Sequence, residues 1–426
     1  MDKITRYSYY LIFILSIGII TSCVEKKSEE KKEHGTATTA LIEIIQSNPE
    51  VKSMLITSLE KASQLNPDRK TNPVQNLDEY YDFVSYCETA MPWALVKKPD
   101  YPEIFNHMFQ SLLYFYFLLD QPLPGLEGKG YYKNTLQYAD PIASWLNSFS
   151  KSWGKYLDTP DSWNAEYYQM AFNDPAFGLQ NGWYEDGSNW KTFNQFFSRY
   201  LSSPEKRPIA SPEDNSVVVS FADSKPLGVW AIDDNSNIVS NGGVPVKSAT
   251  LRSVVNLIGE DSKYKEAFAN GTFTHSFLNV NDYHRYHFSM GGTIKEARII
   301  QGTNPTGGSI SWDGENRRYA FNPSDVGWQT VETRGCVILD AGEYGLVALL
   351  PIGMAAVGSV NFEDNIKPGL QVEKGDMLGH FAFGGSDFIM VFQDKVNFTL
   401  DAPKQEDSDS YQHLLMGERL GYLSKR

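Results

Sequence analysis

Hydrophobic and polar positions follow a helical pattern in the first part of the chain. Over residues 38–177, apolar residues recur at the spacing of one buried helix face. Residues 112–119 are apolar without interruption, but this run is too short to span a membrane, so it predicts a buried core helix. Thr159-Pro160 offers an N-cap residue followed by proline, which predicts that a helix starts at this point.

The pattern changes after Asn181-Gly182. Short runs rich in β-branched and aromatic residues then alternate with Gly, Pro and Asn, at residues 217–219, 229–232, 336–339, 347–352 and 388–392. We therefore expect an α+β protein, in which a helical N-terminal domain at residues 38–180 is followed by a mainly β domain at residues 181–426.

The N-terminus has the pattern of an export signal. Lys3 and Arg6 precede an apolar core at residues 9–20, and Ile20-Thr21-Ser22-Cys23 resembles a bacterial lipobox, in which Cys23 takes the lipid. Residues 1–22 are then a lipoprotein signal peptide, and residues 23–37, rich in Glu and Lys, are a solvated tether. We expect an exported lipoprotein, anchored to a membrane of the bacterial cell envelope. The alternative is a simple secretory signal with an incidental cysteine.

Composition narrows the class of protein. At 41% hydrophobic residues, the chain can bury a sizeable core. The net charge of −14 excludes nucleic acid as a partner, because phosphate binding needs clustered cations. Only Cys87 and Cys336 remain beyond the signal, so the chain is no disulfide scaffold, and the sequence leaves open whether these two pair.

Gly384-Gly385-Ser386 is the first candidate for chemistry. Glycines adopt backbone conformations closed to other residues, so they can hold the bond before Ser386 in a strained geometry that is open to attack. The Gly385–Ser386 bond is therefore a candidate self-cleavage site. The alternative is a plain β-turn that carries a hydroxyl.

The residues around this site resemble the C-terminal signature of the phosphatidylserine decarboxylase family, which is pyruvoyl-dependent. The resemblance continues in four ordered blocks over about residues 190–400, which makes chance a poor explanation. The blocks are residues 193–199 with Arg207-Pro208, residues 220–223, residues 281–287 with Gly292-Thr293-Ile294, and residues 372–392.

The resemblance implies a role for each of four residues. Ser386 matches the nucleophile that attacks Gly385 and becomes the pyruvoyl group, His287 the base that activates it, and Asp223 the carboxylate that orients the base. His284 matches a histidine of the substrate step. In a regular strand, positions 284 and 287 face opposite sides, so both reach one site only through a bulge or bend. The spacing of Asp282, His284 and His287 fits no common zinc motif, so we expect no metal.

The chain departs from the family pattern directly after the cleaved serine, where Asp387 replaces the usual Thr or Ser. Its charge could lie next to the pyruvoyl carbonyl, slowing processing or repelling an acidic substrate; alternatively, it points to solvent. Phe221 and Ser224 also replace the usual Pro and Gly beside Asp223, so the loop that holds this carboxylate can differ.

Three functions follow from these observations. The resemblance implies decarboxylation of phosphatidylserine to phosphatidylethanolamine at a membrane surface, with the cleaved C-terminal fragment as an internal partner. The long aromatic N-terminal region instead resembles the branch of the family that includes L-tryptophan decarboxylases, which act on a free amino acid. The third is a non-catalytic binding lipoprotein that keeps the fold but is never cut.

Overall fold

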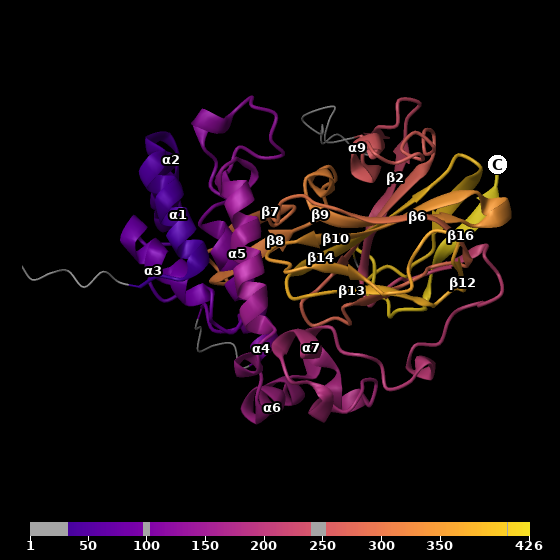
Figure 1. Cartoon of the computed structure of the whole chain (residues 1–426), viewed down its shortest axis with the longest axis horizontal. Coiled ribbons are helices and arrows are strands. Elements are labelled where there is room, and N and C mark those ends of the chain that lie inside the picture. The colour runs from indigo at the N-terminus through magenta and orange to yellow at the C-terminus, as the bar shows by residue number, and fades with distance from the viewer. Residues whose placement is uncertain (1–32, 97–102, 240–252, 407) are drawn as a thin grey trace, which may run out of the picture. The chain divides into compact units, whose positions relative to one another are not determined.

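Helices dominate the N-terminal part of the computed structural model (Figure 1), which describes residues 33–96, 103–239, 253–406 and 408–426. The predicted signal peptide, Cys23 and most of the tether lie outside the described residues. The helices are α1 (Thr36–Ser47), α2 (Pro49–Leu65), α3 (Leu77–Cys87), α4 (Ile104–Phe117), α5 (Ile142–Leu157), α6 (Ala165–Asn173), α7 (Phe193–Phe197) and α9 (Val254–Ile258).

Local sequence explains where several helices lie. The apolar run at residues 112–119 forms the second half of α4, which is buried as predicted. A helix does start at Pro160 with Thr159 as its N-cap residue, but it is a 3₁₀ helix of three residues, Pro160–Ser162. The α-helix begins only at Ala165, where the side chain of Asn164 accepts a hydrogen bond from the Tyr167 N–H and caps the first turn.

Strands form the C-terminal part, and each predicted apolar run lies in one of them. The strands are β1 (Val217–Val219), β2 (Lys225–Ile232), β3 (Ile238–Val239), β4 (Thr272–Leu278), β5 (Arg285–His287), β6 (Gly292–Ile300), β7 (Ser309–Asp313), β8 (Arg318–Asn322), β9 (Thr333–Asp340), β10 (Leu346–Met354), β11 (Val360–Phe362), β12 (Gln371–Val372), β13 (Met377–Phe381), β14 (Gly385–Phe392), β15 (Val396–Leu400) and β16 (Arg419–Lys425).

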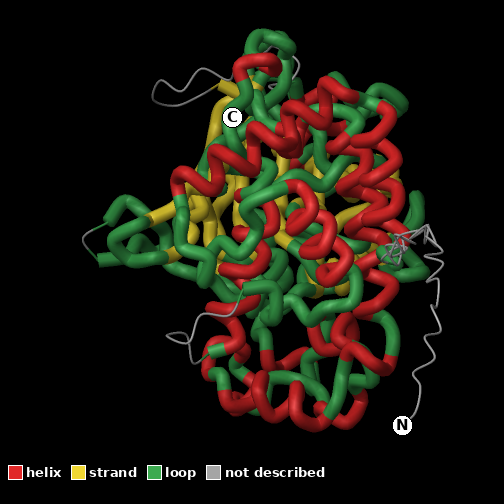
Figure 2. The backbone as a smooth tube through the Cα atoms, turned by 90° about the vertical axis from the view of Figure 1, so that its left-hand side faces the viewer, coloured by secondary structure: helices red, strands yellow, loops and turns green. Residues whose placement is uncertain are grey.

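The largest sheet has eight strands in the order β12-β6-β9-β10-β14-β4-β2-β3, with antiparallel pairs throughout. Two three-stranded sheets, β1-β16-β15 and β11-β13-β5, and the β7-β8 hairpin complete the β structure. β14 therefore lies in the interior of the large sheet, between β10 and β4. Figure 2 shows the helices lying over the strands on one side.

Alternation along β14 separates two hydrophobic cores. Ile389 and Val391 pack into the core shared with the helices. Phe388 and Met390 pack into a second core that lies among strands. Since successive strand residues point to opposite faces, Ser386 shares a face with Phe388, whereas Asp387 shares a face with Ile389.

The expected α+β class, helical first and mainly β afterwards, is confirmed. Helices and strands of His34–Arg426 pack into one compact unit, and the boundary between residues 180 and 181 stays a prediction. Cys87 and Cys336 are both buried free thiols, which answers the question of pairing. Of the helices in the described part of the chain, none is long and apolar enough to cross a membrane.

Candidate active site

Ser386 is the second residue of β14 and is fully buried, at 0% exposure. Its hydroxyl oxygen lies 3.3 Å from Nδ1 of His284, which is itself fully buried just before β5. Catalytic hydrogen bonds are often long before substrate or transition state tightens them, so this distance suits a nucleophile and its base. The structure thus brings Ser386 and His284 together.

The ring of His284 is held in one orientation. Nε2 lies 2.9 Å from the carbonyl oxygen of Asn279, and the ring stacks on Phe197 at 3.8 Å between centroids. A carbonyl only accepts, so Nε2 carries the proton and the lone pair of Nδ1 faces Ser386. Burial, aided by the charge of Arg199, lowers the pKa of His284 to about 3, which keeps the ring neutral at pH 7.

The backbone before Ser386 is constrained on both sides. Gly384 has a φ of +148°, and a Cβ there would overlap the backbone nitrogen of Val357. Opposite it, the buried residues Ala355 and Ala356 have φ values of 41° and 66°. Each such non-glycine conformation costs about 1–3 kcal/mol. Residues with positive φ therefore lie on both sides of the Gly385–Ser386 bond, in the chain before it and in the turn that faces it.

The structure gives Asp223 and His287 other partners than those expected. Asp223 receives two hydrogen bonds from Arg207, at 3.0 and 2.7 Å, and both side chains are buried. Nδ1 of His287 lies 2.8 Å from the carbonyl oxygen of Gly375, and Nε2 lies 3.1 Å from the hydroxyl of Tyr283.

The expected contacts from Asp223 to His287 and from His287 to Ser386 are therefore absent among the hydrogen bonds of the described residues. The physical reason is their placement three residues apart, with His284 just before β5 and His287 at its end, because an odd separation in an extended chain turns two side chains to different sides. His287 remains within electrostatic reach of Asp223, and burial lowers the pKa of His287 to about 4. The roles of the two histidines stay predictions, but the position beside Ser386 belongs to His284.

Asp387 lies on the face of β14 opposite to Ser386, so the alternative in which it points to solvent is wrong, and its effect on processing stays a prediction. It is fully buried rather than exposed to solvent, and its carboxylate lies 2.7 Å from Nε2 of His275. Burial raises the pKa of Asp387, and Glu332, buried near it, has a pKa raised by the same cause. The charge of Asp387 therefore acts in the core shared with the helices.

Helix α7 covers the Ser386 side of the site. Phe197 stacks on His284, and Phe383, just before the cleavage site, packs edge-on against Phe193 and Phe197. The side-chain oxygen of Asn194 accepts a hydrogen bond of 3.0 Å from the Phe383 N–H. The first and last of the four sequence blocks thus meet at Ser386.

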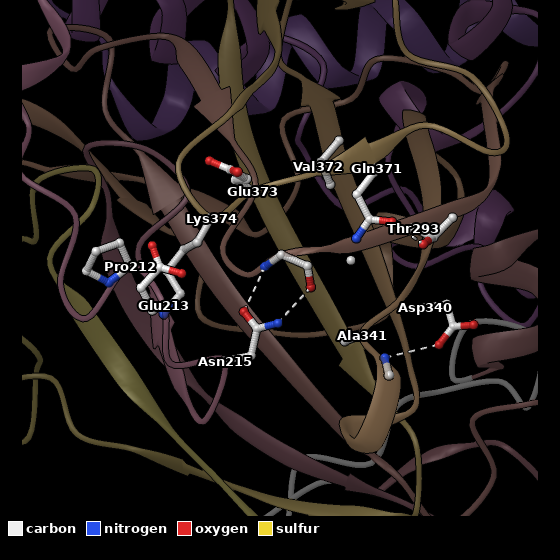
Figure 3. Close-up of a pocket in the computed structure, with 13 residues that line it drawn as sticks. Pro212, Glu213, Asn215, Thr293, Asp340, Ala341, Gln371, Val372, Glu373 and Lys374 are labelled. Carbon is white, nitrogen blue, oxygen red and sulfur yellow. Dashed lines mark hydrogen bonds between the residues drawn. The ribbon is translucent and has the colours of Figure 1, made fainter.

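Two of the cavities in the described part of the chain are lined wholly or partly by residues of the predicted β domain. A polar one of about 450 Å³ is lined by Pro212, Glu213, Asn215, Gly291, Gly292, Thr293, Asp340, Ala341, Gly342, Gln371, Val372, Glu373 and Lys374 (Figure 3). It includes neither Ser386 nor His284. A smaller one of about 260 Å³ is lined in part by Asp223, Asp282 and His413, which places it at the outer edge of the site. In the described ranges, His, Cys, Asp and Glu form no group of three that could hold a metal ion.

Sequence reasoning gave no role to several residues that contact the predicted site residues. Arg207 belongs to the first of the four sequence blocks, but the resemblance gives it no role. In the structure it is the cationic partner that the buried carboxylate of Asp223 needs. Asn279 contacts His284 through its backbone carbonyl, and such a contact cannot be predicted from the residue type. For Asp282, the sequence pattern raises only the role of a metal ligand.

Comparison with known proteins agrees with this arrangement. The family model for phosphatidylserine decarboxylase matches residues 193–422, more than half of the chain. A phosphatidylserine decarboxylase proenzyme 2 from Oryza sativa is 32% identical over 56% of this chain, which spans 35% of that protein. Decarboxylase iboD from Amanita muscaria is 30% identical over 58% of this chain and 75% of its own length.

A phosphatidylserine decarboxylase proenzyme from Clostridium novyi is 28% identical over 64% of this chain and 84% of its own length. The chain thus spans about a third of the rice relative and most of the other two. The matched residues include Ser386, His284 and the elements that hold them. The chain belongs to the phosphatidylserine decarboxylase family.

Proposed function

We propose that this protein is a self-cleaving, pyruvoyl-dependent decarboxylase that converts phosphatidylserine to phosphatidylethanolamine. The observation that carries the proposal is the buried Ser386 beside the neutral, oriented His284, two residues after Gly384, whose backbone conformation and close contact with Val357 require glycine. The names of the relatives as proenzymes support self-cleavage.

Cleavage follows from the chemistry of these residues. Ser386 Oγ attacks the carbonyl carbon of Gly385 while Nδ1 of His284 takes the hydroxyl proton. The C–N bond breaks as the nitrogen of residue 386 takes a proton, which leaves Gly385 joined to Oγ by an ester. Loss of the α-proton of residue 386 then expels Gly385 as a carboxylate. Water replaces the nitrogen of the resulting enamine, which releases ammonia and leaves a ketone.

The position of Ser386 fits the group that this reaction makes. Residue 386 becomes the first residue of β14, held between Gly353 of β10 and Leu278 of β4 and shielded from water. A pyruvoyl group there would supply an electron-poor carbonyl that accepts the electrons left when CO2 departs. His284 lies within reach to exchange a proton with a substrate bound at residue 386.

Two observations bear on the substrate. The names of the rice and Clostridium relatives support phosphatidylserine. A helical region of more than 150 residues precedes the part that matches the family model, which supports a free aromatic amino acid such as tryptophan as the second candidate.

We place the protein in the bacterial cell envelope, exported and anchored through lipid on Cys23. The support is the apolar core at residues 9–20, the lipobox-like residues before Cys23 and the charged tether that follows. Anchoring suits a phospholipid substrate, which stays in the membrane surface. A water-soluble substrate gains nothing from it.

The test is release of CO2 by the purified protein from phosphatidylserine in mixed micelles and from free tryptophan. We expect release from the phospholipid and none from the Ser386→Ala variant. If CO2 is released from tryptophan but not from phosphatidylserine, the substrate is a free aromatic amino acid. Fully cut protein that decarboxylates neither compound contradicts both substrates.

A further inference from the structure

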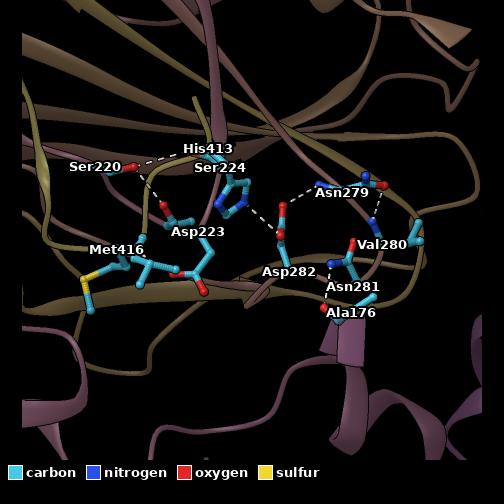
Figure 4. A network of polar contacts seen from close by, with 12 residues as sticks. Ala176, Ser220, Asp223, Ser224, Asn279, Val280, Asn281, Asp282, His413 and Met416 are labelled. Atoms are coloured by element: carbon cyan, nitrogen blue, oxygen red, sulfur yellow. Dashed lines mark hydrogen bonds and ion pairs between the residues drawn. The ribbon is translucent and has the colours of Figure 1, made fainter. Parts of the chain in front are cut away.

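The chain after β15 returns to the outer edge of the active site. Leu414 and Ser224 exchange two backbone hydrogen bonds, at 2.9 and 2.8 Å, and Gly417 donates to the carbonyl of Ser220. Residues 413–416, which we call the tail, are thereby held against the loop that carries Asp223 (Figure 4).

The tail contacts two buried carboxylates. The backbone N–H of Met416 donates to Asp223 at 2.8 Å, and Nε2 of His413 lies 2.9 Å from Asp282. The His413 side chain is 42% exposed, whereas that of Asp282 is 6% exposed. His413 therefore joins a buried carboxylate to the surface.

Asp282 in turn closes the turn that orients His284. Its carboxylate accepts a 2.7 Å hydrogen bond from the N–H of Asn279, and its own N–H donates to the Asn279 carbonyl at 2.9 Å. That carbonyl oxygen is also the acceptor for Nε2 of His284. Hydrogen-bond contacts thus run without a gap from His413 through Asp282 and Asn279 to His284 and Ser386.

We propose that His413 and Asp282 are positioning residues that fix the ring of His284 toward Ser386 by clamping the Asn279 turn. Neither side chain touches Ser386. The consequence for self-cleavage rests on the proposed function, whereas the orientation of His284 does not. After a cut before Ser386, Asp282 lies in the large fragment and His413 in the small one, so the contact also joins the two fragments.

The charge of His413 depends on its surroundings. The charged groups that face it are Asp282, Asp223 and Glu418, of which Asp223 is paired with Arg207. Burial lowers the pKa of His413, but the hydrogen bond and charge of Asp282 outweigh it and raise the pKa above its ordinary value. While Asp282 stays ionised, the charged contact is complete below the ordinary pKa of histidine and is lost as the pH rises through the raised value. Burial raises the pKa of Asp282 as well, so the contact is also lost in acid, when this carboxylate takes a proton.

The direct test measures the tautomer of the His284 ring by NMR. In the uncut Ser386→Ala chain labelled with ¹⁵N-histidine, His284 should show the tautomer protonated at Nε2. His287, whose Nδ1 donates to Gly375, should show the opposite tautomer and serves as the internal reference. Adding Asp282→Ala should mix the tautomers of His284 and leave His287 unchanged.

Cleavage supplies the second readout. In the chain with Ser386 intact, Asp282→Ala should slow cleavage by about 100-fold, the effect of a misplaced reacting group. His413→Gln should slow it less, and the ratio of wild-type to variant rate should fall toward one as the pH rises. Arg419→Gln is the matched control, because it removes another ion pair of the C-terminal segment, with exposed Asp401, that does not involve the Asn279 turn.

An unchanged His284 tautomer in both Asp282→Ala and His413→Gln would overturn the proposal, and so would equal slowing by Arg419→Gln. If the Asp282→Ala variant does not fold, the His413→Gln variant still allows both measurements, because the His413 side chain is partly exposed and its replacement disturbs the core less. Wild-type protein that stays uncut contradicts the proposed function instead, because the tautomer is measured without cleavage.

Discussion

Two histidines that lie three residues apart, His284 just before β5 and His287 at its end, have different partners. His284 contacts Ser386 and the Asn279 carbonyl, whereas His287 contacts Gly375 and Tyr283. Both rings are buried and have lowered pKa values, so burial alone does not distinguish them. The contact with Ser386 does.

His284 is therefore expected to be the base for cleavage. Replacing it with Gln should slow cleavage by about 10²–10⁴-fold, the usual contribution of general base catalysis. His287→Gln, the matched control, should have a smaller effect. The rate at which the small fragment appears in freshly made protein, followed on denaturing gels, measures both. If His287→Gln slows cleavage more than His284→Gln does, His287 is the base, as the family pattern implies.

Asp223 and Arg207 form a buried ion pair, so we expect them to contribute to stability. Asp223→Asn should leave the Arg207 charge unpaired and lower the free energy of unfolding by about 3–5 kcal/mol. Denaturant unfolding of the uncut Ser386→Ala chain measures this. The double variant with Arg207→Gln is the control and should recover part of the loss. Unchanged stability with cleavage slowed on the order of 10⁴-fold would instead support an orienting role for Asp223.

The loop between β13 and β14 is the element that presents the cleavage site. Gly384 combines a positive φ with close contact to Val357, and Gly385 donates its N–H to the Ala355 carbonyl at 2.9 Å. The loop can close only against the turn at residues 355–357. Its geometry therefore depends on glycine at position 384.

Gly384→Ala should stop or strongly slow cleavage, because a Cβ forces the loop away from Val357. Gly125→Ala is the matched control, since a Cβ there meets no atom and its φ is not positive. Intact mass of both variants reports the cut fraction. Normal cleavage of Gly384→Ala would show that the loop geometry is not needed.

Elements were easier to predict from sequence than the contacts of the site. The apolar runs at residues 217–219 and 388–392 lie in β1 and β14, because burial and β-propensity act locally. The partner of Asp223 could not be read in the same way, since Arg207 and the tail reach it from distant positions. The face on which Asp387 lies depends on the register of β14 with β4, which pairs Ile389 with His275.

At the scale of the molecule, a cut before Ser386 divides the largest sheet. β14, β15 and β16 then belong to the small fragment, but β14 stays paired on both edges, with β10 and β4. Phe388, Met390 and Phe392 remain buried in the core among the strands. Separating the fragments would expose this surface and break both strand pairs, so we expect them to stay together in native conditions.

The most direct measurement is the intact mass of purified wild-type protein under native and denaturing conditions. Self-cleavage predicts one species in native conditions. In denaturant it predicts two, the smaller of which spans residues 386–426 and resists Edman sequencing until its ketone is converted to an amine. Ser386→Ala should give one unbroken chain in both. A single unbroken chain in the wild type would contradict self-cleavage and favour a binding lipoprotein.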